Sequence, residues 1–276
     1  MGLKRVGQVG QEGQVGRGGD PGGAGGVALP RDNHARMHAG FGWRVPEHFN
    51  IAQACCARWA RAGDATKRIA IHAHGEGAGS TFLTYSGLQE GASRLSHLLA
   101  SLGVRRGDRV AIVMPQRFET AIATMAVLQM GAVAMPLSML FGPEALAYRL
   151  QDSEAVLAIC DESSIGNLLS VRPECPALRQ LIGVGAAAPK ADVGWEAGCA
   201  GQRSRFAAVR TRAEEGAVLI YTSGTTGPPK GALLPHRALI GNLPGFVCSQ
   251  NWFGFSPEAG ADGDGPNASV FWSPAD

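Results

Sequence analysis

The clearest periodic pattern in the chain lies between Thr84 and Gly103. Apolar side chains recur there at spacings of four, three, four and three residues, at Leu88, Ala92, Leu95, Leu99 and Leu102. These spacings place one apolar stripe along an α-helix and predict an amphipathic helix that packs on a core. Thr84 can cap its N-terminus, with a capping box from Ser86 and Gln89 as the alternative. Gly103 is suited to end the helix, because glycine readily adopts the left-handed conformation that follows a last turn.

The remaining apolar segments alternate between short β-rich runs and helical periods. Helices are predicted at 51–62, 118–130, 143–152 and 162–169. Strands are predicted at 68–73, 80–83, 109–114, 132–136, 155–160, 179–184 and 217–221, and the first two form a hairpin that turns at 75–79. Strands that alternate with helices indicate βαβ units. We therefore predict an α/β fold with layered, largely parallel sheets and flanking helices. The Ala/Gly-rich residues 186–206 are predicted to form a surface connection.

One stretch is apolar enough to suggest a membrane span, because residues 120–143 carry no charge over 24 positions. Gly131 and Pro136 divide it into an Ala-rich helix and a short strand, so we predict two buried core elements and no span. A net charge of +2 gives no reason to expect nucleic acid or an anionic membrane as a partner. The six cysteines form no C-x-x-C pair, which predicts free thiols in a reducing cytoplasm.

The start of the chain differs in composition from the rest, with 11 glycines among residues 1–26. Such a segment cannot bury enough apolar surface to offset the entropy lost on ordering. Lys4 and Arg5 are not followed by the apolar run of a secretory signal. We predict a disordered Gly-rich leader over 1–42, with Met37 as an alternative start, and an ordered part over 43–276.

The most specific motif follows the predicted strand at 217–221, where residues 221–231 are YTSGTTGPPKG. Successive backbone N–H groups in such a turn form an anion-binding nest, and side-chain hydroxyls donate to phosphate oxygens. Lys230 adds a mobile positive charge. The motif predicts a loop that binds the phosphates of ATP through Thr222, Ser223, Gly224, Thr225, Thr226, Gly227 and Lys230. A flexible surface loop rich in Gly, Ser and Thr is the alternative for a segment of this composition.

This loop differs from the P-loop of the common NTPases, whose pattern G-x-x-x-x-G-K-[ST] leads directly into a helix. Here Gly224 and Gly227 are too close together, two prolines precede Lys230, and Gly231 follows it. The string instead resembles the phosphate-binding signature of the AMP-forming acyl-CoA synthetases, which are adenylate-forming enzymes.

Two further segments resemble elements of the same family in the same order. They are TFLTYSGL at 81–88, where Gly87 replaces the usual acidic residue, and LQMGAVAMPL at 128–137. The resemblance covers about 49–276. It implies that 43–276 is the N-terminal portion of an AMP-binding domain, an incomplete large N-terminal domain of an adenylate-forming enzyme.

The reaction that this resemblance implies has two steps. A carboxylate attacks the α-phosphate of Mg-ATP to give an acyl-adenylate and pyrophosphate, and the thiol of coenzyme A then forms acyl-CoA and AMP. The loop over 222–230 is expected to hold the β- and γ-phosphates, and Lys230 is the candidate catalytic residue because it offsets charge on the leaving group. The implied cofactors are ATP, Mg²⁺ and coenzyme A. The implied partner is a small carboxylic acid, either a short- or medium-chain fatty acid or an aromatic acid.

Several parts of the family's site do not occur in these 276 residues: the adenine-binding motif, the ribose-binding aspartate and the small C-terminal domain with its lysine. The resemblance therefore implies a fragment of an acid–CoA ligase that does not turn over by itself. The alternatives are a non-catalytic ATP-binding half-domain and a non-functional product of a truncated gene.

Histidines and cysteines supply the remaining candidates. His236 follows the loop and could position substrate or phosphate, with a local hydrogen bond near a helix start as the alternative. His72 and His74 share a strand face, but no third ligand stands nearby, so no metal site is predicted. Cys55 and Cys56 are predicted to pack within a helix.

Overall fold

The computed structural model describes residues 39, 41–75, 79–222 and 227–250 of the 276-residue chain. The chain divides into two units, Met1–Gly42 and Trp43–Asp276, and the helices and strands named below lie in the second. Almost all of the predicted leader at 1–42 lies outside the described residues, so its disorder stays a prediction.

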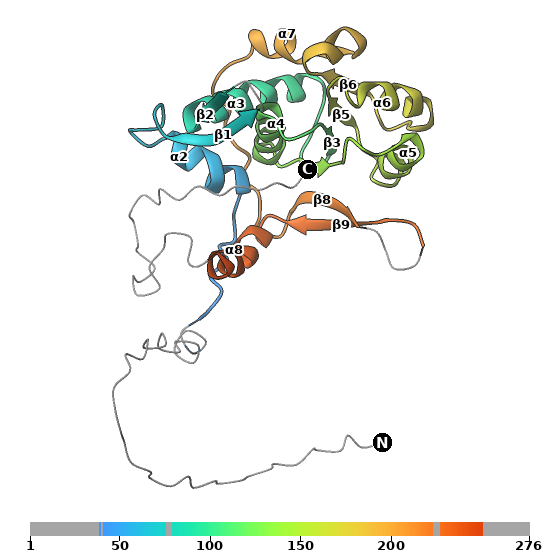
Figure 1. The fold of residues 1–276 in the computed structure, drawn as a ribbon. Helices are drawn as coiled ribbons and strands as arrows, with labels where there is room; N and C mark the ends of the chain where they lie inside the picture. The colour runs from blue at the N-terminus through green and yellow to red at the C-terminus, as the bar shows by residue number, and fades with distance from the viewer. Residues whose placement is uncertain (1–38, 40, 76–78, 223–226, 251–276) are drawn as a thin grey trace, which may run out of the picture. The chain divides into compact units, whose positions relative to one another are not determined.

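In the described part of the chain, a seven-stranded sheet has the order β7-β6-β5-β3-β4-β8-β9 (Figure 1). Its strands are β3 (Arg109–Val113), β4 (Val133–Pro136), β5 (Leu157–Cys160), β6 (Gln180–Gly183), β7 (Val193–Gly194), β8 (Gly216–Thr222) and β9 (Lys230–Pro235). Neighbouring strands are parallel except for β8 and β9, which pair antiparallel. The predicted α/β fold with a largely parallel sheet is confirmed.

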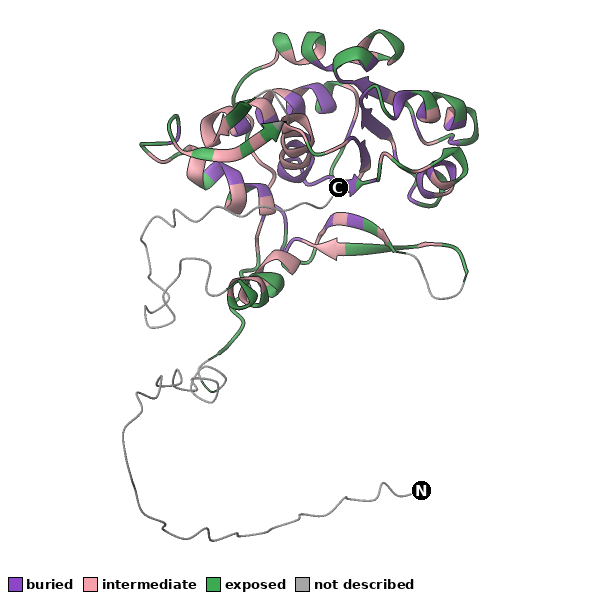
Figure 2. Cartoon of the chain, viewed as in Figure 1, coloured by how far each residue is buried: buried purple, intermediate pink, exposed green. Residues whose placement is uncertain are grey.

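Helices cover both faces of this sheet (Figure 1). Side chains alternate along each strand, so Val110 and Ile112 pack with α3 (Tyr85–Ser101) and α4 (Phe118–Gln129) on one face. Ala111 and Val113 pack with α5 (Pro143–Asp152) and α6 (Ile165–Val171) on the other. Strand β5 is buried throughout and β3 from Val110 to Val113 (Figure 2), which explains why their sequences are continuous apolar runs.

Helix α3 has both of the ends that its sequence predicts. The Thr84 hydroxyl accepts a hydrogen bond from the N–H of Gly87 at 3.1 Å, whereas Ser86 donates to Glu90 instead of forming a capping box. At the other end, Gly103 has φ +82° and donates to the carbonyl of Ala100. The next residue donates back to the carbonyl of Leu99, which completes a Schellman motif.

The uncharged stretch at 120–143 forms the larger part of α4, then β4, as predicted. Ala132 and Met135 are fully buried and Ala134 nearly so, which places these apolar residues in the core. No helix in the described part of the chain is both long enough and apolar enough to cross a membrane.

The predicted hairpin and the first helix also form. Strands β1 (Ile69–Gly75) and β2 (Gly79–Thr84) pair antiparallel. The helix at 51–60 has π-helical turns in its middle, η1 (Gln53–Ala57), and ends in α2 (Arg58–Ala60). Cys56 is fully buried there, and burial raises the pKa of its thiol to about 12, so this cysteine packs in the core as an unreactive side chain.

The segment at 186–206 lies mostly at the surface, as predicted, but it is more than a connection. This segment holds the 3₁₀ turn η3 (Gly185–Lys190), strand β7 at the edge of the sheet and helix α7 (Trp195–Ala200). Trp195 is buried against the α3 side of the core. A Cβ added at Gly198 would lie 2.8 Å from the side chain of Leu98, so the small residues permit close packing of α7 on α3. Their composition was mistaken for that of a loop alone.

A buried histidine joins the first helix to the end of β9. His236 is fully buried, and its Nδ1 accepts a hydrogen bond from the N–H of Ile51 at 3.2 Å. Its Nε2 has no hydrogen-bond partner among the described residues. Burial lowers the pKa of His236 to about 4, and the nearby carboxylate of Glu215 opposes this shift. The ring is therefore neutral at pH 7. Helix α8 (Ala238–Ser249) begins two residues later.

Replacement of Leu95 by alanine tests the packing of α3. Leu95 is fully buried, so Leu95→Ala is expected to lower the free energy of unfolding by about 2–5 kcal/mol. Leu140 is 79% exposed, and Leu140→Ala is the control, with an expected change within about 0.5 kcal/mol. Urea denaturation followed by circular dichroism measures both. Equal losses of unfolding free energy in the two variants would contradict the burial of Leu95 in the core.

Acidification tests the burial of His236. Its pKa lies below the ordinary value of 6.5, so the unfolded chain takes up the proton first as the pH falls. The stabilisation is therefore fully present above about pH 6.5 and lost as the pH falls towards 4, by about 3 kcal/mol.

The measurement is urea denaturation between pH 7 and pH 4. We expect the loss of stability over this range to be smaller in His236→Gln than in the wild type. His72→Gln, in strand β1, is the control and should keep the wild-type dependence. Parallel plots of the free energy of unfolding against pH for the wild type and His236→Gln would show that this histidine does not contribute to the pH dependence of stability.

Candidate functional site

The predicted phosphate-binding loop at 222–230 is closed by a β-hairpin. Strand β8 leads into it and β9 leads out, and their antiparallel register pairs Thr222 with Lys230 and Tyr221 with Gly231. The structure thus brings together the first and last residues of the predicted loop, and both are exposed. Ser223, Gly224, Thr225 and Thr226 lie outside the described residues.

The two described glycines of the motif have different roles. Gly227 has φ +87° and open space around the position of a Cβ, so its backbone conformation is what requires glycine. Gly231 lies in β9, and a Cβ there would lie 3.2 Å from Cζ of Tyr221. The nearest atom at Gly231 is Cδ1 of Leu219 at 3.1 Å, so the side chains of Leu219 and Tyr221 together crowd this position.

Helix α5 contacts the residues next to both ends of the loop. The Tyr148 hydroxyl donates to the carbonyl of Pro229 at 2.9 Å, and the Tyr221 hydroxyl donates to Oδ2 of Asp152 at 2.6 Å. Burial is the main cause that raises the pKa of Tyr221, and the bond to Asp152 adds to it, so this phenol stays protonated at neutral pH. No sequence motif marks these contacts, because α5 lies about 70–80 positions upstream of the loop.

The histidine and cysteine candidates are accounted for by packing. His236 lies near the start of α8, as its alternative interpretation predicts, but its hydrogen bond is not local, because Nδ1 accepts from Ile51, 185 positions away. The ring of His72 packs edge-on against Phe82, and His74 lies 3.2 Å from the Ser80 hydroxyl. Among the described residues, no group of three His, Cys, Asp or Glu side chains could hold a metal ion.

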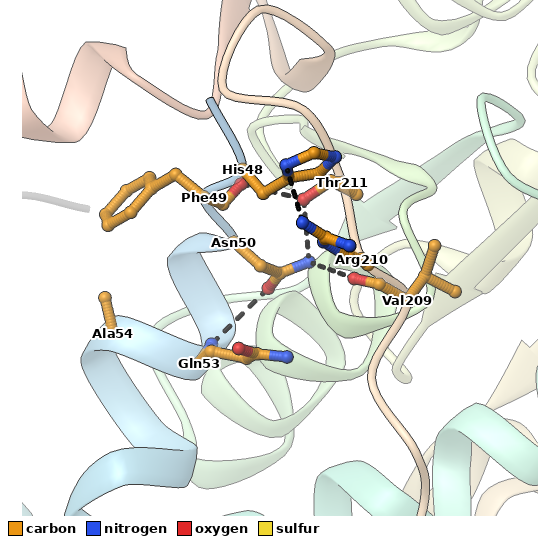
Figure 3. A pocket seen from close by; sticks show the side chains of 8 residues that line it. All are labelled: His48, Phe49, Asn50, Gln53, Ala54, Val209, Arg210 and Thr211. Carbon is orange, nitrogen blue, oxygen red and sulfur yellow. Dashed lines mark hydrogen bonds between the residues drawn. The ribbon is translucent and has the colours of Figure 1, made fainter. Parts of the chain in front are cut away.

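A pocket of about 260 Å³ lies apart from the loop, between the start of the first helix and residues 209–211 (Figure 3). Its lining consists of His48, Phe49, Asn50, Gln53, Ala54, Val209, Arg210 and Thr211. The side chain of Asn50 accepts hydrogen bonds from the N–H groups of Ala52 and Gln53 and donates to the carbonyl of Leu128. The amide oxygen and nitrogen of Asn50 are thus both hydrogen-bonded within the fold. The side chain lines the pocket and connects the first helix to the segment at 209–211.

Comparison with known proteins assigns the chain that carries this loop to a family. The family model described as "AMP-binding enzyme" matches residues 57–275, which is most of the chain. The loop, β8 and β9 lie inside this match, as do the five helices α3 to α7.

Named relatives agree with that match. The chain is 32% identical over 249 residues to an acetyl-coenzyme A synthetase of Streptomyces coelicolor, covering 85% of this chain and 36% of the relative. It is 39% identical over 153 residues to the long-chain-fatty-acid–CoA ligase FadD15 of Mycobacterium tuberculosis, covering 53% of this chain and 25% of the relative. The chain therefore spans about a third or less of these relatives' length.

Solved structures share the fold. An acyl-CoA synthetase of Brucella canis aligns with a TM-score of 0.62 and 26% identity, over 76% of this chain and 38% of that one. The anthranilate CoA ligase AuaEII, in complex with anthranoyl-AMP, aligns with a TM-score of 0.64 and 22% identity, over 72% of this chain and 37% of that one, which shows the fold alone. With the family model matched from residue 57 to residue 275, the chain belongs to the AMP-binding, adenylate-forming enzymes and corresponds to an N-terminal portion of them.

Proposed function

We propose that this chain is the phosphate-binding part of an AMP-forming acid–CoA ligase. The observation that carries the proposal is the β8–β9 register, which places Thr222 and Lys230 opposite each other where the two strands meet the loop. Family membership and the names of the relatives support the reaction class. The ligase activates a carboxylic acid with ATP and passes the acyl group to coenzyme A.

The nucleotide fits the chemistry of the described residues. Gly227 keeps open space beside its backbone, and the exposed Thr222 and Lys230 offer a hydroxyl donor and an ammonium charge. Thr222, Ser223, Gly224, Thr225, Thr226, Gly227 and Lys230 are the proposed ligands of the β- and γ-phosphates. Lys230 stabilises negative charge on the departing pyrophosphate and is the proposed catalytic residue. ATP would supply the adenylyl group that activates the acid, with pyrophosphate as the leaving group and Mg²⁺ as the counter-ion.

The proposed acid is a short- or medium-chain fatty acid or an aromatic acid. Acetyl-coenzyme A synthetase, a relative named for a short-chain acid, supports this range, whereas FadD15 is named for long-chain fatty acids. All six cysteines are free, which fits the reducing cytoplasm where we place the protein.

Removal of the Lys230 ammonium group tests the phosphate site. Lys230→Ala is expected to weaken binding of Mg-ATP by about 10- to 100-fold, because a hydrogen bond to a charged group contributes about 1.5–3 kcal/mol. Isothermal titration calorimetry measures Kd. Lys190→Ala removes an exposed lysine outside the loop and should bind like the wild type. A folded wild type without saturable ATP binding would overturn the proposed function, as would an unchanged Kd in Lys230→Ala.

Carboxylate-dependent exchange of labelled pyrophosphate into ATP tests the ligase chemistry, with acetate, octanoate and benzoate as substrates. We expect exchange from a polypeptide that also supplies the rest of the relatives' length, and none from the 276 residues alone. The chain covers only 36% of the acetyl-coenzyme A synthetase, so most of that enzyme has no counterpart here. Acid-dependent exchange by the purified 276-residue chain would contradict this expectation.

A further inference from the structure

Two polar side chains of α5 bind the two sides of the hairpin that carries the loop. Tyr148 donates to the carbonyl of Pro229, the residue before Lys230, and Asp152 accepts from Tyr221, the residue before Thr222. Tyr148 and Asp152 are four positions apart, so they lie on the same face of the helix. One rigid element is therefore bonded to the chain immediately before each of the paired residues Thr222 and Lys230.

These contacts are additional to the packing of α5 in the core. Leu146, Ala147 and Leu150 are the apolar residues that bury the helix against the sheet. Tyr148 is only half-buried and Asp152 is exposed, so neither side chain is required to fill the core. Their hydrogen bonds therefore hold the hairpin in position and are not needed to bury the helix.

Aromatic and cationic contacts hold the same junction. The rings of Tyr148 and Tyr221 meet edge-to-face, with centroids 6.5 Å apart. The guanidinium of Arg149 lies 4.0 Å from the ring centroid of Phe141 and 5.6 Å from that of Tyr221. Arg149 is buried, and its Nε has no hydrogen-bond partner among the described residues, so ring faces compensate part of its charge.

The bond to Pro229 fixes the backbone of Lys230. The carbonyl of Pro229 and the N–H of Lys230 belong to one planar peptide group, so holding the oxygen sets the orientation of that whole group. The ring of proline also fixes its own φ near −65°, which removes a degree of freedom on the other side of the carbonyl. The ring of Tyr221, on β8, packs on Gly231 of β9. The hydrogen bond from Tyr221 to Asp152 therefore restrains both strands of the hairpin.

We propose that Tyr148 and Asp152 of α5 are positioning residues that set the separation and orientation of Thr222 and Lys230, and through them the affinity for the phosphates of the nucleotide. The identity of the ligand rests on the proposed function, whereas the positioning of the hairpin by α5 does not. The two parts are tested by different measurements.

The first variant is Tyr148→Phe, which removes one hydroxyl and keeps the ring. Because a hydrogen bond contributes about 0.5–1.5 kcal/mol, Kd for Mg-ATP and for inorganic pyrophosphate is expected to rise about 2- to 10-fold. Hydrogen exchange in the absence of nucleotide should accelerate by a similar factor in the peptide 230–235, and should not change in β3 at 109–113. Tyr85→Phe, in α3 beside Trp59, is the matched control and should change neither measurement.

The second pair of variants changes an exposed position, where folding is not at risk. Asp152→Ala removes the shorter of the two hydrogen bonds of the Tyr221 hydroxyl, the one of 2.6 Å, and leaves the carbonyl of Arg149 at 3.4 Å. Asp152→Asn keeps an oxygen acceptor without the charge. We expect Asp152→Ala to weaken pyrophosphate binding and accelerate exchange at 216–222, and Asp152→Asn to restore most of both. A general loss of structure would not be rescued by asparagine in this way.

The outcomes separate the two proposals. If the wild type does not bind ATP or pyrophosphate, the proposed function fails, and hydrogen exchange still reports whether α5 positions the hairpin. If Tyr148→Phe and Asp152→Ala leave exchange in 216–222 and 230–235 unchanged, the positioning role is overturned. If exchange accelerates while Kd for pyrophosphate stays at the wild-type value, α5 holds the hairpin without setting phosphate affinity, and the inference is overturned in that part.

Discussion

The structure depends on one constraint: a parallel sheet exposes apolar side chains on both faces, and both must be covered. Helices α3 and α4 cover one face, and α5 and α6 cover the other. This arrangement places α5 beside the strands that carry the phosphate-binding motif. The same helix therefore buries leucines in the core and presents Tyr148 and Asp152 to the two sides of the hairpin. Stability and the geometry of the candidate site are linked through this one element.

The single antiparallel pair in the large sheet gives the motif its shape. Parallel strands need a long crossover, whereas β8 and β9 are joined by the short loop at 223–229 and pair directly. Thr222 and Lys230 thus face each other by register, and the side chains of Leu219 and Tyr221 crowd the position of Gly231. The hairpin therefore sets the relative position of the two residues at the ends of the predicted phosphate-binding loop.

Buried polar groups connect the start of the first helix to α4, to the segment before β8 and to the end of β9. Asn50 joins Leu128 and Thr211, and His236 accepts from Ile51. A buried polar group without a partner costs free energy, so these contacts fix one arrangement of the first helix more strictly than apolar packing would. The Nε2 atom of His236 is left without a partner among the described residues, and burial keeps the ring neutral.

The sequence by itself determined the order and type of most elements, both caps of α3, the largely parallel sheet and the family signature at 221–231. These depend on local periodicity, on turn chemistry and on a contiguous string. The boundary of α6 shifted by about two or three residues, and residues 186–206 were interpreted as a connection alone, because glycine and alanine favour both exposed loops and close helix packing. The contacts of α5 with Tyr221 and Pro229, and the burial of His236, were decided only by the tertiary structure. They join residues about 70–185 positions apart, and no local pattern specifies which distant side chain will meet a given carbonyl or ring.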